Sequence, residues 1–357
     1  MVQLLSTLVT ALAAATAVSA TPTFGHGKWG KKGLHTEAVK AGLKYFGTAA
    51  DNVNLHDEVY VDKLLDRVDF GMITPTNTQK WETVEPQEGV FNFTEGDRLI
   101  NMALRNGQKT RCHALVWHSQ LAPWVEEKEW TNKTLIAAMV NHVTKVAKHF
   151  KGRCYAWDVL NEALEEDGTY RKTVFLDVIG PAYIPIAFKA AQKADPFAKL
   201  YYNDYNLESV SPKSKAAIEI IKLIRAHGGR IDGMGMQGHL ILGQRPSFEE
   251  QKAVIKSYTD AGVESAYTEL DIRMDMPATK KKLQDQSVAY YDSVRACVES
   301  KRCVGVTIWD WTDKYSWIPG WFEGEGAGLP WDEDFKKKPA YDGILKALTK
   351  KKSWKWW

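Results

Sequence analysis

Residues 110–161 contain the pattern that decides the fold. Two short apolar runs, TRCHALVW at 110–117 and YAWDVLN at 155–161, lie on either side of a stretch with helical periodicity, TNKTLIAAMVNHVTKVAKHFK at 131–151. A strand, a long helix and a second strand in this order are typical of a βαβ unit, in which the two strands are parallel. The pattern therefore predicts a parallel sheet that is covered by helices.

The same alternation continues in both directions along the chain. It predicts strands at 45–49, 70–74, 110–117, 155–161, 200–203, 233–237, 265–270 and 304–309. It predicts helices at 57–67, 131–151, 181–194, 211–227, 248–261, 281–300 and 341–349, among others. Ser211 is a typical helix N-cap, Pro212 fits the first helical position, and Gly228 marks a helix end. Eight strands that alternate with helices, without a repeat or a linker, predict an α/β fold, a single (β/α)8 TIM barrel.

The composition excludes several classes of protein. The chain has 357 residues, of which 44% are hydrophobic, and its 47 Lys and Arg nearly balance its 44 Asp and Glu, for a formal net charge of +3. A chain this apolar can bury a large core, so we do not expect an intrinsically disordered protein. A nucleic-acid-binding protein is also not expected, because it would need a strongly basic surface.

The N-terminal segment predicts secretion. Residues 1–20, MVQLLSTLVTALAAATAVSA, are apolar and end in small residues, as a secretory signal peptide does before its cleavage site. A membrane anchor is the alternative, but this stretch is short and weakly apolar for a span of about 20 residues. We expect a signal peptide at 1–20, a flexible lead-in at 21–33, the catalytic barrel at 34–349 and a basic, Trp-rich tail at 350–357.

The cysteines are interpreted in the light of secretion, because an oxidising compartment favours disulfides. Cys297 and Cys303 flank a short turn, so we predict a disulfide between them. Cys112 and Cys154 each begin a strand-like run and would face each other if the strands are neighbours; a disulfide and two reduced core residues both fit. The spacing of the four cysteines matches no zinc motif. Glycosylation sequons, which fit a secreted protein, occur at Asn92 and Asn132.

Polar residues follow most of the predicted strands, where barrel enzymes place their chemistry. They include Asn77, Lys80, Trp117, Gln120, Asn161, Glu162, Asn203, Tyr205, Gln237, His239, Glu269, Asp271 and Trp309. Amides and carboxylates bind pairs of hydroxyl groups, and indole faces stack on sugar rings. There is no Gly-rich phosphate loop and no spacing of metal ligands, so we expect a carbohydrate substrate, no metal and no cofactor.

Two glutamates, Glu162 and Glu269, are the candidates for catalysis. Glycoside hydrolysis needs one carboxylic acid to protonate the leaving oxygen and one carboxylate to attack or to activate water. Glu269, Asp271 and Arg273 share one face of a strand that should be buried, which is costly for two carboxylates unless they are paired. His239, on the preceding strand, can bridge Glu269 and Asp271.

Each glutamate also has a structural alternative. Glu162 is followed by several acidic residues and fits a helix-capping or surface acid in a solvated turn. Glu269 fits a position at the rim of the barrel beside an ion pair between Asp271 and Arg273.

These residues lie in motifs that resemble those of a known family, the fungal members of glycoside hydrolase family 10, whose typical activity is endo-β-1,4-xylanase. The matching segments, in order, are GTAADN at 47, PTNTQKW at 75, RCHALVWHSQLAPWV at 111, CYAWDVLNEAL at 154, YYNDYN at 201, GMGMQGHL at 233, YTELDIRM at 267 and TIWDWTDKYSW at 307. Together with KKPAYDGI, which ends at Ile344, they cover essentially the whole predicted mature chain.

The resemblance implies a role for each site residue. Glu162 would be the acid/base, Glu269 the nucleophile, and Asn161 a ligand of the 2-hydroxyl of the sugar that is cleaved. His239 and Asp271 would support Glu269. Sugar-binding residues implied on the glycone side are Asn77, Lys80, His113, Trp117 and Gln120; Gln237, Trp309 and Trp317 would form floor and wall, and Asn203 and Tyr205 would lie toward the aglycone.

The expected function is a secreted, extracellular, retaining β-glycosidase that cleaves internal β-1,4-xylosidic bonds in plant cell-wall xylan. We expect it to act as a monomer without a cofactor, a nucleic acid or a membrane. One alternative is a tomatinase-like glycosidase that detoxifies plant saponins. The resemblance raises this alternative, because some fungal relatives in the family remove sugars from plant saponins. Thr76, where many members of the family have glutamate, is the position that we expect to separate the two substrates. A second alternative is a non-catalytic carbohydrate-binding or host-interaction protein.

Overall fold

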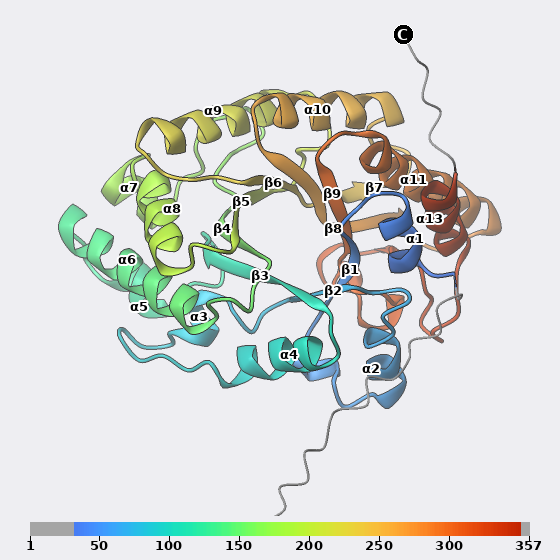
Figure 1. The fold of residues 1–357 in the computed structure, drawn as a ribbon, viewed down its shortest axis with the longest axis horizontal. Coiled ribbons are helices and arrows are strands. Elements are labelled where there is room, and N and C mark those ends of the chain that lie inside the picture. Colours follow the sequence, from blue (N-terminus) through green and yellow to red (C-terminus); the bar gives the residue numbers. More distant parts are fainter. Residues whose placement is uncertain (1–31, 351–357) are drawn as a thin grey trace, which may run out of the picture. The chain divides into compact units, whose positions relative to one another are not determined.

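Eight parallel strands close into a ring in the computed structural model, which describes residues 32–350 (Figure 1). They are β1 (Tyr45–Ala50), β2 (Met72–Pro75), β3 (Lys109–Val116), β4 (Ala156–Asn161), β5 (Lys199–Asp204), β6 (Gly233–Met236), β8 (Glu264–Asp275) and β9 (Cys303–Ile308). Each pairs in parallel with the next, and β9 pairs with both β8 and β1, which closes the ring. All eight predicted strands are present, and the (β/α)8 barrel is confirmed.

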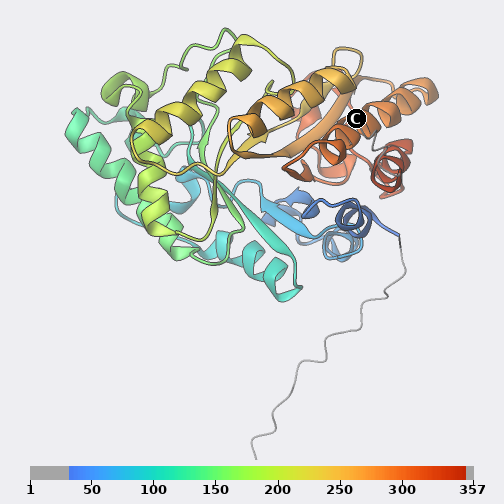
Figure 2. The ribbon, with the colours of Figure 1, turned by 45° about the horizontal axis from the view of Figure 1, so that its top comes forward.

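Helices alternate with these strands and lie outside the ring (Figures 1 and 2). The larger ones are α2 (Glu58–Leu64), α4 (Thr94–Arg105), α6 (Asn132–His149), α8 (Tyr183–Ala194), α9 (Pro212–Ala226), α10 (Phe248–Asp260), α11 (Lys280–Glu299) and α13 (Pro339–Thr349). The sequence pattern does not predict α4, because Phe93 precedes it and provides no side-chain cap. The pattern does predict α9, where Ser211 accepts a hydrogen bond from the backbone of Ser214 and Pro212 is the first residue.

Short elements fill the connections. They are α1 (Leu34–Lys40), the 3-10 helices η1 (Asn52–Asn54) and η2 (Asp313–Tyr315), α3 (Trp81–Val84), α5 (Pro123–Glu127), α7 (Val174–Ile179) and α12 (Ile318–Trp321). Two short strands extend the sheet beyond the ring: β7 (His239–Ile241) pairs in parallel with β8, and β10 (Glu325–Gly326) pairs with β8 in the antiparallel direction. Apart from α1, these elements follow strands, so they lie on the end of the barrel where the polar residues gather.

The interior of the ring is packed toward the amino ends of the strands. Tyr45 and Tyr201 fill it together with Met72, Ala156, Ala266 and Val304. Glycines make room for the two phenol rings: a Cβ at Gly233 would lie 2.2 Å from the ring of Tyr201, and one at Gly305 would lie 2.3 Å from the ring of Tyr45. This end of the barrel is therefore closed, and the carboxyl ends of the strands remain for polar side chains.

Two disulfides connect the described residues. Cys297 at the end of α11 is joined to Cys303 at the start of β9, as the sequence predicts. Cys112 of β3 is joined to Cys154, just before β4, so the alternative of two reduced cysteines there is wrong. The predicted signal peptide and most of the predicted lead-in and tail lie outside the described residues. Within 32–350, no helix is both long enough and apolar enough to span a membrane.

Candidate active site

The carboxylate of Glu162 is held by three neutral donors at the carboxyl end of β4. Its Oε1 accepts hydrogen bonds from the side-chain amides of Asn161 (3.1 Å) and Gln237 (2.9 Å), and its Oε2 accepts one from the indole of Trp117 (2.9 Å). The side chain is 14% exposed, and the ring nitrogen Nδ1 of His118 lies 3.9 Å from Oε2. Glu162 is therefore an oriented, partly accessible carboxylate, which does not fit a capping or surface acid.

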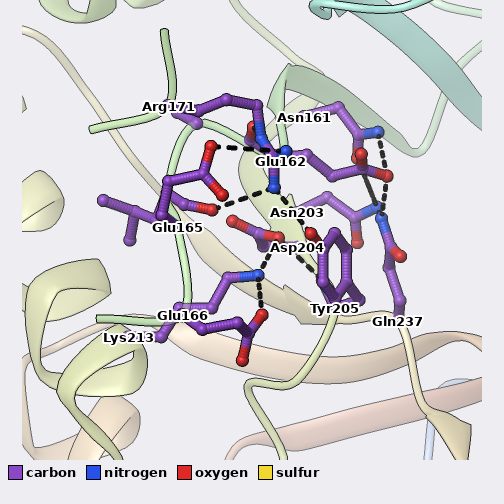
Figure 3. Close-up of polar contacts among 12 residues, drawn as sticks. Asn161, Glu162, Glu165, Glu166, Arg171, Asn203, Asp204, Tyr205, Lys213 and Gln237 are labelled. Atoms are coloured by element: carbon purple, nitrogen blue, oxygen red, sulfur yellow. Dashed lines mark hydrogen bonds and ion pairs between the residues drawn. The ribbon is translucent and has the colours of Figure 1, made fainter. Parts of the chain in front are cut away.

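The backbone of Glu162 has a conformation that is uncommon for a residue with a side chain, with φ at 54°. Its N–H donates to the carbonyl of Asn203 (2.9 Å), and its carbonyl accepts from Nε of Arg171 (3.0 Å). Arg171 also donates to the carbonyl of Leu164 (3.2 Å) and to the hydroxyl of Tyr205 (2.6 Å), as Figure 3 shows in part. Arg171 thus ties the loop after β4 to the loop after β5 directly behind Glu162.

Glu269 lies inside β8 and is only 4% exposed. Its Oε1 accepts from the amide of Asn203 (2.7 Å), and its Oε2 contacts Nε2 of His239 (3.2 Å). Burial alone would raise the pKa of Glu269, but the hydrogen bond from His239, the charges of His113 and His239 and the bond from Asn203 outweigh it and lower the pKa. The same Asn203 amide donates to the side-chain oxygen of Asn161 (2.8 Å), so one amide links the two glutamate sites.

His239 bridges two carboxylates, as the sequence predicts. Its Nδ1 lies 2.9 Å from Asp271, and its Nε2 faces Glu269. Burial would lower the pKa of His239, but the charges of Asp271 and Glu269 and the hydrogen bonds to them raise it to about 10. The ring is therefore protonated at neutral pH and donates to both acids. Arg273 pairs with Glu325 of β10 and not with Asp271, which removes the proposed Asp271–Arg273 ion pair.

Lys80 is the centre of a second group beside the glutamates. Its ammonium donates to Asn77 (2.9 Å) and Gln120 (2.6 Å) and lies 4.7 Å from the centre of the Trp117 ring. Burial lowers the pKa of Lys80 to about 8, although the charges of Glu269 and Glu162 favour its protonated form. Amide, ammonium and indole groups together form a surface that suits a polyhydroxylated ligand.

The remaining predicted residues surround these groups. The indole of Trp317 donates to Asp271 (2.8 Å). His113 contacts Asp158 (3.0 Å) through Nδ1, and its ring meets that of Trp309 at 5.5 Å. Tyr205 contacts Arg171 instead of either glutamate.

Sequence reasoning missed two residues that support the site. Arg171 lies in an irregular loop and has no pattern that would identify it. The sequence does contain an indication for Lys213. A lysine in the first turn of α9 is unfavourable because of the helix dipole, so its ammonium group is expected to pair with an acidic side chain. Its side chain is fully buried between Asp204 (3.0 Å) and Glu166 (3.0 Å), over the ring of Tyr205 (Figure 3). Within 32–350, no group of His, Cys, Asp and Glu is arranged to hold a metal ion.

Two carboxylates at the carboxyl end of a (β/α)8 barrel, surrounded by amides and indoles, are typical of an enzyme that hydrolyses glycosidic bonds. The model of glycosyl hydrolase family 10 matches residues 33–347. The chain therefore belongs to this family and is a glycoside hydrolase.

Relatives and solved structures agree with this assignment. The chain is 54% identical to endo-1,4-beta-xylanase D of Talaromyces funiculosus, over 88% of this chain and 77% of the relative. It is 54% identical to endo-1,4-beta-xylanase A of Humicola insolens, over 89% and 87%. The structure of the Penicillium canescens xylanase XylE superposes with a TM-score of 0.87 at 42% identity and covers 89% of this chain and 98% of that one. A family 10 xylanase of Bispora sp. MEY-1 with xylobiose superposes with a TM-score of 0.86 at 40% identity, over 88% and 99%.

Proposed function

We propose that the protein is a secreted, retaining endo-β-1,4-xylanase that cleaves internal bonds of plant cell-wall xylan. The observation that carries the proposal is the contrast between the two carboxylates. Glu269 is paired with a protonated histidine, whereas Glu162 is held by neutral donors, and Asn203 links the two sites. Relatives named as endo-1,4-beta-xylanases and a related structure with xylobiose support xylan as the substrate.

In the first step, Glu269 attacks the anomeric carbon and forms a covalent glycosyl ester. Glu162 gives its proton to the departing glycosidic oxygen, so the bond to the aglycone breaks as the ester forms. The protonated His239 keeps Glu269 ionised before the attack, because a proton on the nucleophile would cost it the bond to the imidazolium.

In the second step, Glu162 accepts a proton from water, and the oxygen of this water attacks the anomeric carbon. The ester breaks, Glu269 leaves as a carboxylate, and the product has the original β configuration. Three neutral donors, the amides of Asn161 and Gln237 and the indole of Trp117, hold the carboxyl group of Glu162 in place during this exchange.

The sugar beside the cleaved bond is positioned by the groups around the two glutamates. We assign the 2-hydroxyl to Asn161 and the glycone hydroxyls to Asn77, Lys80 and Gln120. Trp309 and Trp317 supply ring faces next to His239. Lys80 contributes a buried positive charge that attracts the charge of Glu269, which favours the carboxylate form of the nucleophile.

The test uses linear β-1,4-xylo-oligomers and a steroidal saponin side by side, with NMR detection of the first product. We expect cleavage at internal bonds of the xylo-oligomers, a β-anomer as the first product and no action on the saponin. Cleavage of the saponin alone would replace this proposal with the saponin-hydrolase alternative. An α-anomer as the first product would contradict the retaining mechanism, and no cleavage of either would favour a non-catalytic protein.

Secretion is part of the proposal. It is supported by the signal-like residues 1–20, by the two disulfides and by the exposure of both sequon asparagines, Asn92 and Asn132. Expression of the full chain in a fungal host should release the protein into the medium with Thr21 as the first residue. Retention in the cells with Met1 intact would contradict it.

A further inference from the structure

A row of aromatic rings leads from Glu269 toward solvent. Trp309 and Trp317 both lie against His239, with ring centres 6.3 and 4.8 Å from the imidazole. The ring centre of Trp321 is 6.3 Å from that of Trp317. Trp309 is 8% exposed, whereas Trp321 is 76% exposed. Trp321 is therefore the outermost ring of the row, and within 32–350 it is the one tryptophan in the exposed class.

The segment that presents Trp321 is anchored on both sides. Ile318, at the start of α12, is buried, and the carbonyl of Ile318 accepts a hydrogen bond from the backbone of Phe322 (2.9 Å). The ring of Phe322 packs edge-on against Trp317 at 5.4 Å and lies 3.9 Å below the guanidinium of Arg273. Arg273 pairs with Glu325 of β10, which is itself hydrogen-bonded to β8. A ligand that stacks on Trp321 would thus meet a segment that is already ordered, which lowers the entropic cost of binding.

The order of strands in the ring places Trp321 on the flank of the site. The proposed glycone residues Asn77 and Lys80 follow β2, and Tyr205, assigned to the aglycone side, follows β5. The loop with Trp321 follows β9 and contacts β8. These two strands are neighbours in the ring, and both lie outside the arc that runs from β2 to β5. A main chain that runs from the β2 side to the β5 side would therefore pass beside Trp321, and a branch on that chain would reach it.

An exposed indole offers a broad apolar face with one N–H at its edge, which matches the face and the hydroxyl rim of a sugar ring. We propose that Trp321 is a binding platform for a neutral sugar branch on the substrate main chain near the cleaved bond. This inference rests on the proposed xylanase function and adds a preference for branched substrate.

The test compares Trp321→Ala and Trp321→Phe with the wild type on two substrates with the same xylose backbone, one linear and one with arabinose branches. Loss of one stacking contact should lower kcat/KM on the branched substrate by about fivefold to tenfold, mainly through KM. On the linear substrate the rates should stay within about twofold, and Trp321→Phe should recover most of the loss. Phe197→Ala is the matched control, because Phe197 is 80% exposed and lies before β5 at the opposite end of the barrel.

Other outcomes overturn the inference. Equal losses on both substrates would show that Trp321 only supports Trp317, and no loss on either would show that it binds no branch. An effect of Phe197→Ala equal to that of Trp321→Ala would also exclude a local platform. Failure of the wild type to cleave the linear substrate would count against the proposed function, which keeps the two failures distinct.

Discussion

Glu162 follows the end of the six-residue strand β4, whereas Glu269 lies in the middle of the twelve-residue strand β8. Glu162 has a left-handed backbone and accepts hydrogen bonds from two amides and an indole. Glu269 is nearly buried and faces a protonated histidine. In the proposed mechanism the two glutamates have different tasks, and their surroundings differ accordingly. The proposed nucleophile, Glu269, lies within a long strand beside a charged histidine, whereas the proposed acid/base, Glu162, is held by neutral donors at the end of a strand.

Removal of each carboxylate is the strongest test of this contrast. Glu269→Ala should lower turnover on the order of 10⁴-fold or more with every leaving group, because no ester can form. Glu162→Ala should retain the first step on aryl glycosides whose leaving group needs no proton. Azide should rescue the two variants to opposite anomers, an α-glycosyl azide for Glu269→Ala and a β-glycosyl azide for Glu162→Ala. Identical behaviour of the two variants would mean that the roles are assigned wrongly.

The charge on His239 should have the next largest effect. His239→Asn removes the cation beside Glu269, so the pKa of Glu269 should rise and kcat/KM should fall about a hundredfold. The acidic limb of the pH profile of kcat/KM should move to higher pH. His239→Gln, with a longer amide, is the companion variant. An unchanged acidic limb in both variants would show that His239 does not set the ionisation of Glu269.

The same histidine links stability to pH. Its pKa is raised from 6.5 to about 10, so the protonated form stabilises the folded protein. This contribution is fully present below pH 6.5 and is lost as the pH rises through about 10. Unfolding of the wild type and of His239→Asn, measured from pH 6 to pH 10, should therefore converge at the alkaline end.

The amide that joins the two regions depends on a glycine. A Cβ at Gly235 would lie 2.2 Å from the side-chain oxygen of Asn203. Gly235→Ala should therefore displace Asn203 from both Asn161 and Glu269 and lower kcat by about tenfold, an effect of about 1.4 kcal/mol. Gly320→Ala is the control, because a Cβ there meets nothing within 4 Å. A crystal structure of Gly235→Ala with Asn203 unmoved, together with normal kcat in solution, would contradict this account.

The bond behind Glu162 should contribute less. Arg171→Met removes the donor to the Glu162 carbonyl and to Tyr205, and we expect a severalfold lower kcat with little change in KM. Arg171→Lys should recover little, because one ammonium cannot replace the fork that reaches three oxygens. Tyr205→Phe, which removes one of these contacts, should give a smaller loss. A change in KM alone would indicate a substrate contact instead of a positioning role.

The site residues that lie on strands could be predicted from the sequence better than those that lie in loops. Glu269, Asp271 and His239 could be placed together because side chains alternate along strands and neighbouring parallel strands keep a fixed register. Arg171 could not be predicted, because its position depends on the irregular path of the loop after β4. The partner of Arg273 was also beyond sequence, because β10 is only two residues long and lies more than fifty residues farther along the chain.

The smallest effect on activity is expected from the two disulfides, which differ mainly in loop length. Cys297 and Cys303 are separated by 6 residues and Cys112 and Cys154 by 42. The loop-closure estimate gives about 2 kcal/mol for the short loop and about 4 kcal/mol for the long one. The double serine variant at Cys297 and Cys303 should unfold a few degrees earlier and keep full activity, because neither residue touches the site.

The double serine variant at Cys112 and Cys154 should lose more stability and some activity. Cys112 accepts a contact from Gln79 (3.4 Å), and Gln79 also binds the backbone of His113 (3.1 Å). Opening this disulfide should therefore loosen the middle of β3, which holds His113 where its charge acts on Glu269. Thermal unfolding and kcat, measured on both variants under the same oxidising conditions, should separate the two disulfides. Equal losses of activity would show that the long loop has no special connection with the nucleophile side of the site.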